Sequence, residues 1–254
     1  PRRRKRFRRR KARLPKMRLN KYLALCGVGS RRKVEEFIFA GRVVCGGYQV
    51  TEPGYDVPDG EIVTVDDVEV RPERKIYMVL HKPRGYICAV SDRNYPVILD
   101  LLPREYDYYR LFPVGRLDLQ SEGLLMLTND GDFSQEMIHP RAGITKEYEV
   151  LLDRMPNERE MRQLRDGTVF EGKRLHPVGV DFLQREPEGR WLRFVLNEGV
   201  KREIRLIAEG AGLKVQVLFR RRIGRMELRH LKSGCAREYS ADQLRRMIRH
   251  GGAV

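Results

Sequence analysis

Apolar residues recur at helical spacing near the start of the chain and predict two short helices there. The first runs from Leu19 to a stop at Gly27, and the second begins after Ser30, a residue type that favours N-caps, and closes at Gly41. Their apolar faces are formed by Leu19, Tyr22, Leu23 and Cys26 and by Val34, Phe37 and Ile38.

Short apolar and β-branched runs follow these helices. Residues 42–45 and 48–50 predict a hairpin around Gly46-Gly47, because this turn requires positive backbone torsions, and residues 62–65 predict another strand. Strands are also predicted at residues 76–80, 123–128, 148–152 and 191–196.

Helical segments are interspersed with these later strands. Asp132 is expected to cap a short helix that runs to Met137, and further helices are predicted at residues 158–165 and 203–209. The alternation predicts an α+β fold with a largely antiparallel or mixed central sheet flanked by helices.

The charge is strongly uneven along the chain. Lys and Arg total 51 against 35 acidic residues, a net charge of +16, and a pI near 10 is typical of proteins that bind a polyanion. Residues 1–16 hold eleven basic residues and no acidic one, so the remainder carries only 16 − 11 = +5. We expect this tail to be disordered when free and to act as an RNA-binding arm; the alternative is a dispensable, solvated extension.

Composition also narrows the class of protein. No stretch has the length of a membrane span and the tail lacks the apolar region of a secretory signal, so we expect a soluble, cytoplasmic protein. The four cysteines and five histidines are scattered, which argues against a metal site, a disulfide framework or a Ser-His-Asp site. Nothing in the pattern requires a partner chain, and a monomer is expected.

The expected organisation has five parts. They are a disordered basic tail (1–16), a small domain (17–70), a linker (71–75), a larger domain (76–240) and a C-terminal tail (241–254).

One loop of the larger domain is a candidate for chemistry. Asp118 ends the run Val114-Gly115-Arg116-Leu117-Asp118, directly before the buried strand predicted at 123–128, so its carboxylate is expected to be anchored on rigid structure. Taken alone, an aspartate in such a short loop more commonly caps or closes a turn.

The small domain resembles the S4 RNA-binding domain. The resemblance rests on Arg18 to Leu23, Gly29 to Lys33 and Gly41 to Val43, and covers about residues 17–68. It implies that RNA phosphates are bound by side chains at helix starts and loop ends, with a merely solvated basic face as the alternative. The implied RNA-binding residues are Arg18, Lys21, Ser30, Arg31, Arg32, Lys33 and Arg42.

The larger domain resembles the pseudouridine synthases of the RsuA and RluB type, which join an S4 domain to a catalytic domain. Four motifs occur in the family's order: Lys82 to Gly85, Gly115 to Asp118, Lys146 to Tyr148 and Lys201 to Arg205. The resemblance covers about residues 17–235. It implies isomerisation of a uridine of ribosomal RNA to pseudouridine without a cofactor, and the stretch from Gly115 to Gly131 favours the large-subunit 23S rRNA.

The resemblance also implies roles for single residues. Asp118 matches the catalytic carboxylate, which either adds to the sugar C1′ or assists loss of the C2′ proton. Arg205 matches the basic residue that pairs with it, and Tyr148 the tyrosine that stacks on the flipped uracil; a helix surface charge and a core aromatic are the alternatives. The remaining residues of the implied substrate pocket are Arg116, Leu117, Leu218, Lys201 and Arg202.

Two positions depart from the family's usual pattern. Val200 and Leu206 stand where relatives commonly carry basic or polar residues, which puts the choice of RNA target in doubt more than the chemistry. The competing hypothesis is a noncatalytic S4-domain RNA-binding or ribosome-assembly factor, against which the retention of Asp118, Tyr148 and Arg205 argues. A hydrolase ranks last, because no second carboxylate or metal cluster accompanies Asp118.

Overall fold

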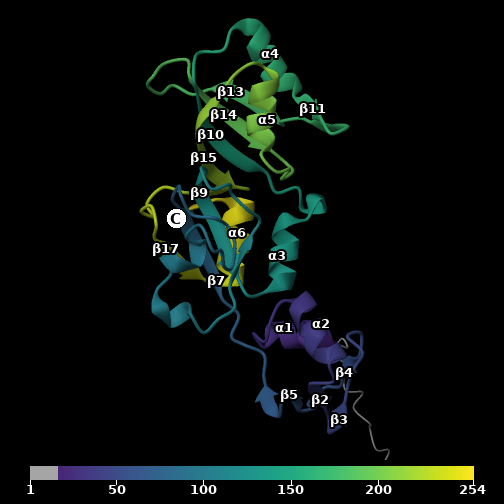
Figure 1. The fold of residues 1–254 in the computed structure, drawn as a ribbon. Coiled ribbons are helices and arrows are strands. Elements are labelled where there is room, and N and C mark those ends of the chain that lie inside the picture. Colours follow the sequence, from purple (N-terminus) through teal and green to yellow (C-terminus); the bar gives the residue numbers. More distant parts are fainter. Residues whose placement is uncertain (1–16) are drawn as a thin grey trace, which may run out of the picture. The chain divides into compact units, whose positions relative to one another are not determined.

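The computed structural model describes residues 17–254, and the chain divides into two compact units at Arg74 and Lys75 (Figure 1). The division falls within the linker expected at residues 71–75. The expected basic tail, residues 1–16, lies outside the described residues. Every helix among residues 17–254 is too short or too polar to cross a bilayer.

The first unit combines two helices with short strands. Its elements are β1 (Met17–Arg18), α1 (Leu19–Leu25), α2 (Arg31–Phe39), β2 (Val43–Cys45), β3 (Tyr48–Gln49), β4 (Asp56–Val57), β5 (Val63–Val65) and β6 (Val68–Val70). Four strands form a sheet in the order β3-β2-β5-β6, and β1 pairs with β4.

The predicted local signals of the first unit are confirmed. The Ser30 hydroxyl accepts a hydrogen bond from Lys33 N at 3.1 Å and so caps α2, and Gly46 and Gly47 have positive φ in the turn between β2 and β3. The two predicted apolar faces meet the strands in one core, where Leu23 and Ile38 are fully buried.

The second unit contains one large sheet. Its strands are β7 (Tyr77–Lys82), β8 (Phe112–Val114), β9 (Glu122–Thr128), β10 (Lys146–Leu152), β11 (Thr168–Phe170), β12 (Lys173–Leu175), β13 (Gly179–Phe182), β14 (Trp191–Leu196), β15 (Val215–Ile223), β16 (Met226–Glu227), β17 (Ala236–Tyr239) and β18 (Gly252–Ala253). Its helices are α3 (Gly131–Ile138), α4 (Glu158–Asp166), α5 (Glu203–Gly210) and α6 (Ala241–His250), with 3-10 turns at Ile98–Leu101, Arg104–Tyr106 and Pro140–Ala142.

The sheet is mixed, which confirms the predicted fold class. Its strands follow the order β13-β14-β10-β15-β9-β7-β17, and every neighbouring pair along this path is antiparallel except β15 and β9. The parallel pair joins segments almost a hundred residues apart in sequence, aligning Phe219 with Glu122 and Arg220 with Gly123. The loop before β9 therefore ends beside the middle of β15.

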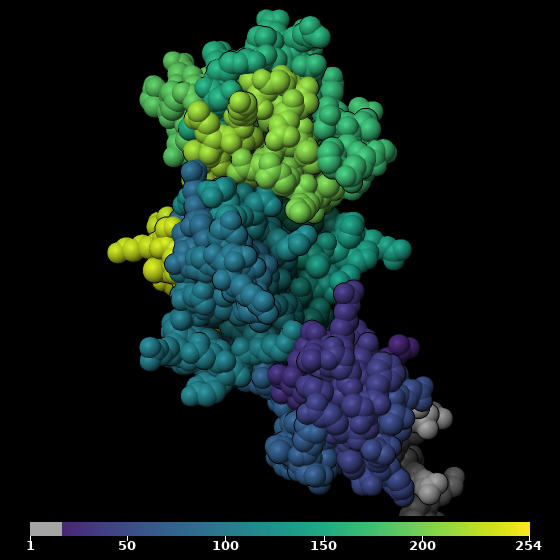
Figure 2. Space-filling view, in the orientation of Figure 1, coloured from purple at the N-terminus to yellow at the C-terminus, as the bar shows by residue number. Residues whose placement is uncertain are grey.

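Helices cover this sheet in two places. One core lies between α4, α5 and the strands β10, β13, β14 and β15, and another lies between α3, α6 and the strands β7 and β9. Alternate residues of β10 point into the first core, because side chains alternate across a strand. In the second unit the side chains fill the space between the ribbons of Figure 1, as the space-filling view shows for one face (Figure 2).

Two predictions for the second unit are wrong. The expected C-terminal tail, residues 241–254, instead forms α6 and β18, because Leu244, Ile248 and Val254 are buried in the second core. The cap of α3 is Asp130 rather than Asp132, since the Asp130 carboxylate accepts hydrogen bonds from the Asp132 and Phe133 amides.

Candidate active site

Asp118 lies in the loop of residues 115–121, which connects β8 to β9. Gly115 has a φ of +76°, a left-handed conformation that glycine adopts without strain, and it turns the chain out of β8. Ser121 N donates to Asp118 O at 3.0 Å, which closes the loop just before β9 begins. The Asp118 side chain is partly exposed, and Leu117 before it is buried in the first core, between α4, α5 and the strands β10, β13, β14 and β15.

A fully buried lysine anchors this loop. Lys82, the last residue of β7, has no exposed surface, and its ammonium donates to Pro83 O at 2.9 Å, Asp118 O at 3.1 Å and Ser121 O at 2.8 Å. Burial lowers the pKa of Lys82, while the Cys88 and Asp118 side chains act in the opposite direction. All three N–H groups of the ammonium are thus used on main-chain carbonyls, two of them in the Asp118 loop.

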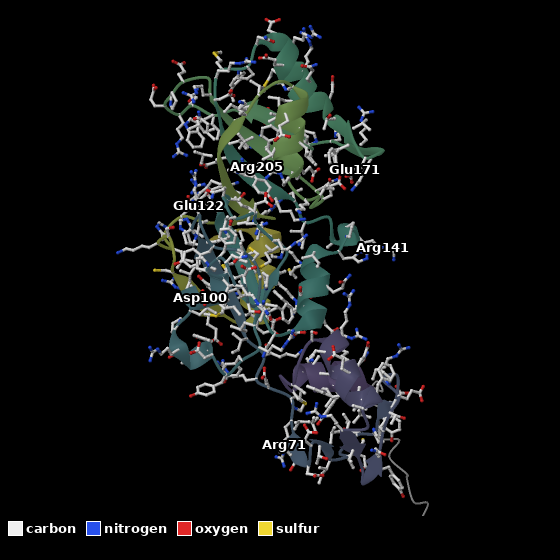
Figure 3. All side chains as sticks on the ribbon, viewed as in Figure 1. Arg71, Asp100, Glu122, Arg141, Glu171 and Arg205 are labelled. Carbon is white, nitrogen blue, oxygen red and sulfur yellow. The ribbon has the colours of Figure 1, made fainter. Side chains whose placement is uncertain are left out.

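The rest of the Lys82 motif contacts the same loop. Gly85 N donates to Leu119 O at 2.9 Å, and Arg84 lies 3.7 Å from the carboxylate of Glu122, the first residue of β9, which Figure 3 labels. The structure therefore brings together two of the motifs that the sequence resemblance singled out.

The close approach of β9 and β15 supports the loop from its other end. Gly123 has a φ of +117°, and a Cβ at this position would lie 2.4 Å from Arg220 O and 2.7 Å from Arg220 N. Only glycine fits this contact. It brings Arg220 close enough to donate from Nε to Leu124 O at 2.7 Å and from Nη1 to Arg116 O at 3.5 Å.

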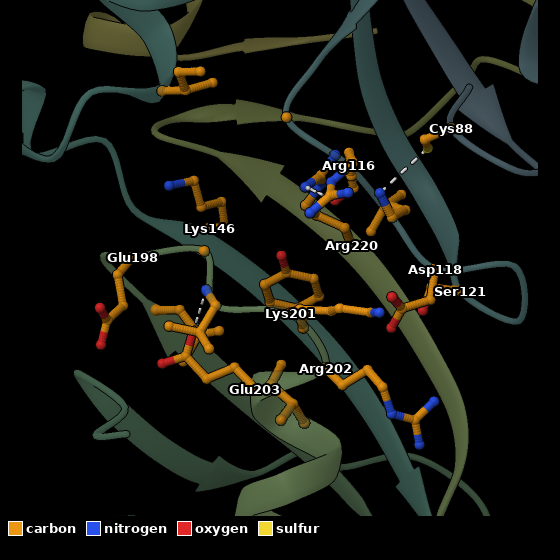
Figure 4. Close-up of a pocket in the computed structure, with 18 of the residues that line it drawn as sticks. Cys88, Arg116, Asp118, Ser121, Lys146, Glu198, Lys201, Arg202, Glu203 and Arg220 are labelled. Atoms are coloured by element: carbon orange, nitrogen blue, oxygen red, sulfur yellow. Dashed lines mark hydrogen bonds between the residues drawn. The ribbon is translucent and has the colours of Figure 1, made fainter. Parts of the chain in front are cut away.

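A cavity of about 690 Å³ opens beside the loop. This volume is in the range that accommodates a small organic ligand. Figure 4 shows Asp118, Lys146, Lys201, Arg202 and Arg220 around it. Six basic and three acidic residues line the cavity: Arg116, Lys146, Lys173, Lys201, Arg202 and Arg220 against Asp118, Glu198 and Glu203. Its lining therefore favours an anionic ligand.

The apolar part of the cavity lining is formed by residues of the first core. Leu117, Tyr148 and Leu218, predicted from the resemblance, all line the cavity and are 7%, 9% and 6% exposed. Tyr148 lies in β10, opposite Phe194 on one side and Arg220 on the other. Tyr148 and Leu218 can therefore be core residues and line the pocket at the same time, because the cavity opens at the edge of this core.

The predicted ion pair between Asp118 and Arg205 is absent among the described residues. Arg205, labelled in Figure 3, lies on α5 and donates from Nη1 to Val215 O at 3.0 Å, at the start of β15. Burial lowers the pKa of Arg205 and so does the neighbouring Arg202, whereas the Asp118 carboxylate raises it. The two side chains thus interact through space, while the Val215 carbonyl takes the hydrogen bond expected for Asp118.

The segment before α5 places the other predicted basic residues at the cavity. Lys201 and Arg202 are exposed and line it, and Arg202 adopts a left-handed conformation with a φ of 60°. Glu203 is only 3% exposed, and its Oε2 accepts from Val200 N at 3.1 Å. Burial raises the pKa of Glu203, and this hydrogen bond opposes the rise.

The predicted RNA-binding residues of the first unit differ in exposure and contacts. Arg18, Arg31, Arg32, Lys33 and Arg42 are exposed, Lys21 is half-buried, and Ser30 serves as the α2 cap. Lys33 pairs with Glu36 at 2.6 Å and Arg42 pairs with Asp66. Both pairs are solvated, so their carboxylates compete only weakly with an RNA phosphate.

Sequence reasoning missed three residues of the site. Lys82 and Glu203 occur in the sequence analysis only within the matched motifs, Glu203 also as the first residue of a predicted helix, and Arg220 is not singled out. A basic residue inside an apolar strand, as in Val215 to Ile223, is the signal that could have identified Arg220, because unpaired charges are rarely buried without a role.

Comparison with known proteins agrees with this geometry. Residues 76–209 match the family described as RNA pseudouridylate synthase, and residues 17–63 match the S4 domain. The chain is 34% identical over 233 residues to the ribosomal large subunit pseudouridine synthase B of Bacillus subtilis (strain 168), which covers 91% of this chain and 95% of the relative. It is 33% identical over 235 residues to an uncharacterized RNA pseudouridine synthase of Aquifex aeolicus (strain VF5), with 92% and 97% covered.

The fold is also similar to that of a solved structure. A crystal structure of a pseudouridylate synthase superposes with a TM-score of 0.64 and 24% identity, across 90% of this chain and 98% of the other. The family match covers more than half of the chain, and the resemblance expected from the four motifs is confirmed. The chain therefore belongs to the RNA pseudouridylate synthase family, with an S4 domain at its start.

Proposed function

We propose that this protein isomerises a specific uridine of ribosomal RNA, in the large subunit, to pseudouridine, with Asp118 as the catalytic carboxylate. The observation that carries the proposal is the Asp118 loop, whose backbone is bonded to a buried lysine at the edge of a basic cavity of nucleotide size. The relative from Bacillus subtilis named for the large subunit supports the choice of RNA.

The reaction breaks the bond between N1 and C1′, turns the uracil and joins C5 to C1′. N1 gains a proton and C5 loses one, so no other reactant is consumed. The target nucleotide has to leave its helix or come from a single-stranded region to enter the cavity. Tyr148 and Leu218 supply apolar walls for the uracil at the point where the cavity meets the core.

Asp118 has two routes open to it. As a nucleophile its carboxylate adds to C1′ while N1 leaves, and as a base it removes the C2′ proton so that a glycal forms. Arg205 acts on this carboxylate through space, and Lys82 holds its backbone. Deuterium at C2′ distinguishes the routes, since only proton removal gives a primary isotope effect on the isomerisation rate.

Tritium release from rRNA fragments labelled with [5-³H]uridine tests the function. Wild-type protein is expected to release tritium from a large-subunit fragment, whereas Asp118→Asn is expected to release none while binding the same fragment within about tenfold, because phosphate contacts dominate affinity. Asp107→Asn, which alters an exposed carboxylate outside the cavity lining, is the matched control and is expected to keep full activity.

Two results would contradict the proposal. Equal release by Asp118→Asn and wild type would remove Asp118 from the chemistry. Absence of release by wild type, on free rRNA and on assembly intermediates of both subunits, would favour a noncatalytic RNA-binding or assembly factor instead.

A further inference from the structure

Arg220 is a buried cation in the wall of the cavity. It lies on β15, is 4% exposed, and contributes to the cavity lining. Its Nε and Nη1 donate to the main-chain oxygens of Leu124 and Arg116, and Nη2 has no hydrogen-bond partner. Among the described residues, the Arg220 guanidinium forms no ion pair with any carboxylate.

This arrangement is costly for a guanidinium. Charged groups that are removed from water are normally paired, and a buried donor without a partner is unfavourable, more so when it is charged. The two carbonyls compensate part of the lost hydration, but they are neutral, so the positive charge of Arg220 has no counter-ion within residues 17–254. Such a group is expected to be balanced by a ligand.

A second cation lies on the neighbouring strand of the same cavity. Lys146 opens β10 and is half-buried, and its ammonium forms no hydrogen bond or ion pair with another described residue. Burial lowers the pKa of Lys146, and the charge of Arg220 lowers it further, while Glu203 and Glu198 act in the opposite direction. The two cations are therefore close enough to repel each other.

The nearby acidic residues do not neutralise this pair. Glu198 is engaged by Lys173 at 2.6 Å, and Glu203 is buried with a raised pKa. Asp118 also lines the cavity, but among the described residues it forms no ion pair with either cation. The cavity interior thus holds an excess of positive charge near β10 and β15.

We propose that Arg220 and Lys146 form a binding site for a phosphate group of the target nucleotide, an inference that rests on the proposed function in taking a nucleotide as the ligand. Uracil is neutral, so its carbonyl oxygens could fill the free donor of Arg220 without balancing its charge. A phosphodiester supplies both an acceptor oxygen and a negative charge, and arginine binds phosphate with charge-assisted hydrogen bonds.

The site has a consequence for the reaction. A phosphate held from β10 and β15 fixes the sugar to which it is attached, while the uracil turns against Tyr148 and Leu218 on the same two strands. Because Nη2 is covered in the free protein, binding needs a local side-chain adjustment of the kind common at ligand sites. Arg220 and Lys146 are thus binding residues that hold the ribose during base rotation.

Binding of mononucleotides to the full chain tests the site without requiring turnover. The probes are uridine, uridine 5′-monophosphate and uridine 3′-monophosphate, titrated by ligand-detected NMR. At least one monophosphate is expected to bind wild-type protein about tenfold more tightly than uridine does, the gain of one charge-assisted contact. Arg220→Gln is expected to lose most of that gain while its affinity for uridine changes less than about threefold.

Two further variants define the source of the gain. Lys146→Gln is expected to lose a smaller part of it, and Arg162→Gln, an exposed position on α4 outside the cavity lining, is expected to lose none. If Arg220→Gln fails to fold, Lys146→Gln carries the test, because the Lys146 side chain makes no hydrogen bond to a described residue.

The proposal is overturned if neither monophosphate binds wild-type protein more tightly than uridine does. It is also overturned if the gain survives intact in both cavity variants, since the exposed Arg116, Lys201 and Arg202 would then be its source. Both results concern binding alone. If tritium is released but neither monophosphate binds more tightly than uridine, the phosphate site is refuted and the proposed function is not. If a monophosphate binds more tightly but no tritium is released, the proposed function is refuted and the phosphate site is not.

Discussion

In the S4 unit Arg31, Arg32 and Lys33 stand exposed on α2, whereas in the second unit Lys82 and Arg220 are buried and bonded to main-chain carbonyls. The exposed side chains of the S4 unit keep their hydration and can approach a phosphate from many directions. The buried side chains of Lys82 and Arg220 have lost their hydration, and their hydrogen bonds hold each of them in one position. We therefore expect positive charge to serve RNA affinity in the first unit and the geometry of the site in the second.

The difference follows from what each task requires. Affinity for a polyanion is a sum over many similar contacts and depends on salt, so no single residue is essential. Placing a carboxylate against a sugar carbon requires a fixed backbone, and displacement by about 1 Å can cost about 100-fold in rate. Replacements should therefore have small, additive effects in the S4 unit and large effects in the second unit.

Lys82→Met is expected to have the largest effect. The side chain is similar in length but donates no hydrogen bonds, so Asp118 O and Ser121 O lose their partner in a buried place. We expect kcat to fall at least about 100-fold and the free energy of unfolding to fall by about 2–4 kcal/mol. Tritium release at saturating RNA measures kcat, and urea unfolding measures the free energy of unfolding.

Lys232→Met, at an exposed lysine of the same unit, is the matched control and is expected to change neither quantity. A Lys82→Met protein with wild-type kcat would show that the Asp118 loop is held by other contacts.

Gly123→Ala tests the approach of β9 to β15. An added Cβ would lie 2.4 Å from Arg220 O, at a backbone conformation that strains any other residue, so we expect a loss of at least about 3 kcal/mol in the free energy of unfolding. Gly131→Ala is the control, since a Cβ there meets nothing within 4 Å, and it is expected to be nearly neutral. Equal stability of the two variants would mean that the strands separate easily at this point.

Replacing Arg31, Arg32 and Lys33 together by Gln should have an intermediate effect. We expect the affinity for rRNA fragments to fall by about tenfold near 0.1 M salt, and the salt dependence to flatten, because three phosphate contacts no longer release counter-ions. With saturating RNA, kcat is expected to stay unchanged. The measurement is a series of filter-binding titrations at increasing salt, with Arg159→Gln and Arg162→Gln on α4 as a control pair. A steep loss of kcat at saturation would place the S4 unit in the chemical step.

Glu203→Gln is expected to have the smallest effect. Because burial raises the pKa of Glu203 above its ordinary 4.5, the folded protein holds the proton more tightly than the unfolded chain does. Wild-type stability from this group is therefore present below pH 4.5 and is lost as the pH rises through the folded-state pKa. At pH 7 the Gln variant should be the more stable protein by about 1 kcal/mol or less, and the difference should vanish toward pH 4.

Thermal unfolding from pH 4 to pH 8 measures this dependence. Glu188→Gln, at an exposed carboxylate, is the control and is expected to unfold at nearly the wild-type temperature throughout. A Glu203→Gln protein that is less stable than wild type at pH 7 would show that the ionised carboxylate is favourable in its site.

Much of the fold could be predicted from local patterns. The Ser30 cap, the Gly46-Gly47 turn and the strand at residues 191–196 all occur where the sequence places them. These features depend on contacts within a few residues, which periodicity and turn chemistry record directly. The order of the four motifs likewise predicts the family and points to the Asp118 loop.

The remaining features depend on residues far apart in the chain. The burial of Leu244, Ile248 and Val254 in one core with α3 and the contact of Lys82 with the Asp118 loop both join distant segments. The choice of Val215 O by Arg205 depends on where β15 begins relative to α5. The parallel pairing of β9 with β15, which places Arg220 in the cavity, is of the same kind. The sequence by itself predicts the type of each element and the residues of the motifs. Only the tertiary structure decides which partner each buried charge has, because a hydrogen bond in the interior depends on which acceptor the fold places within reach of the donor.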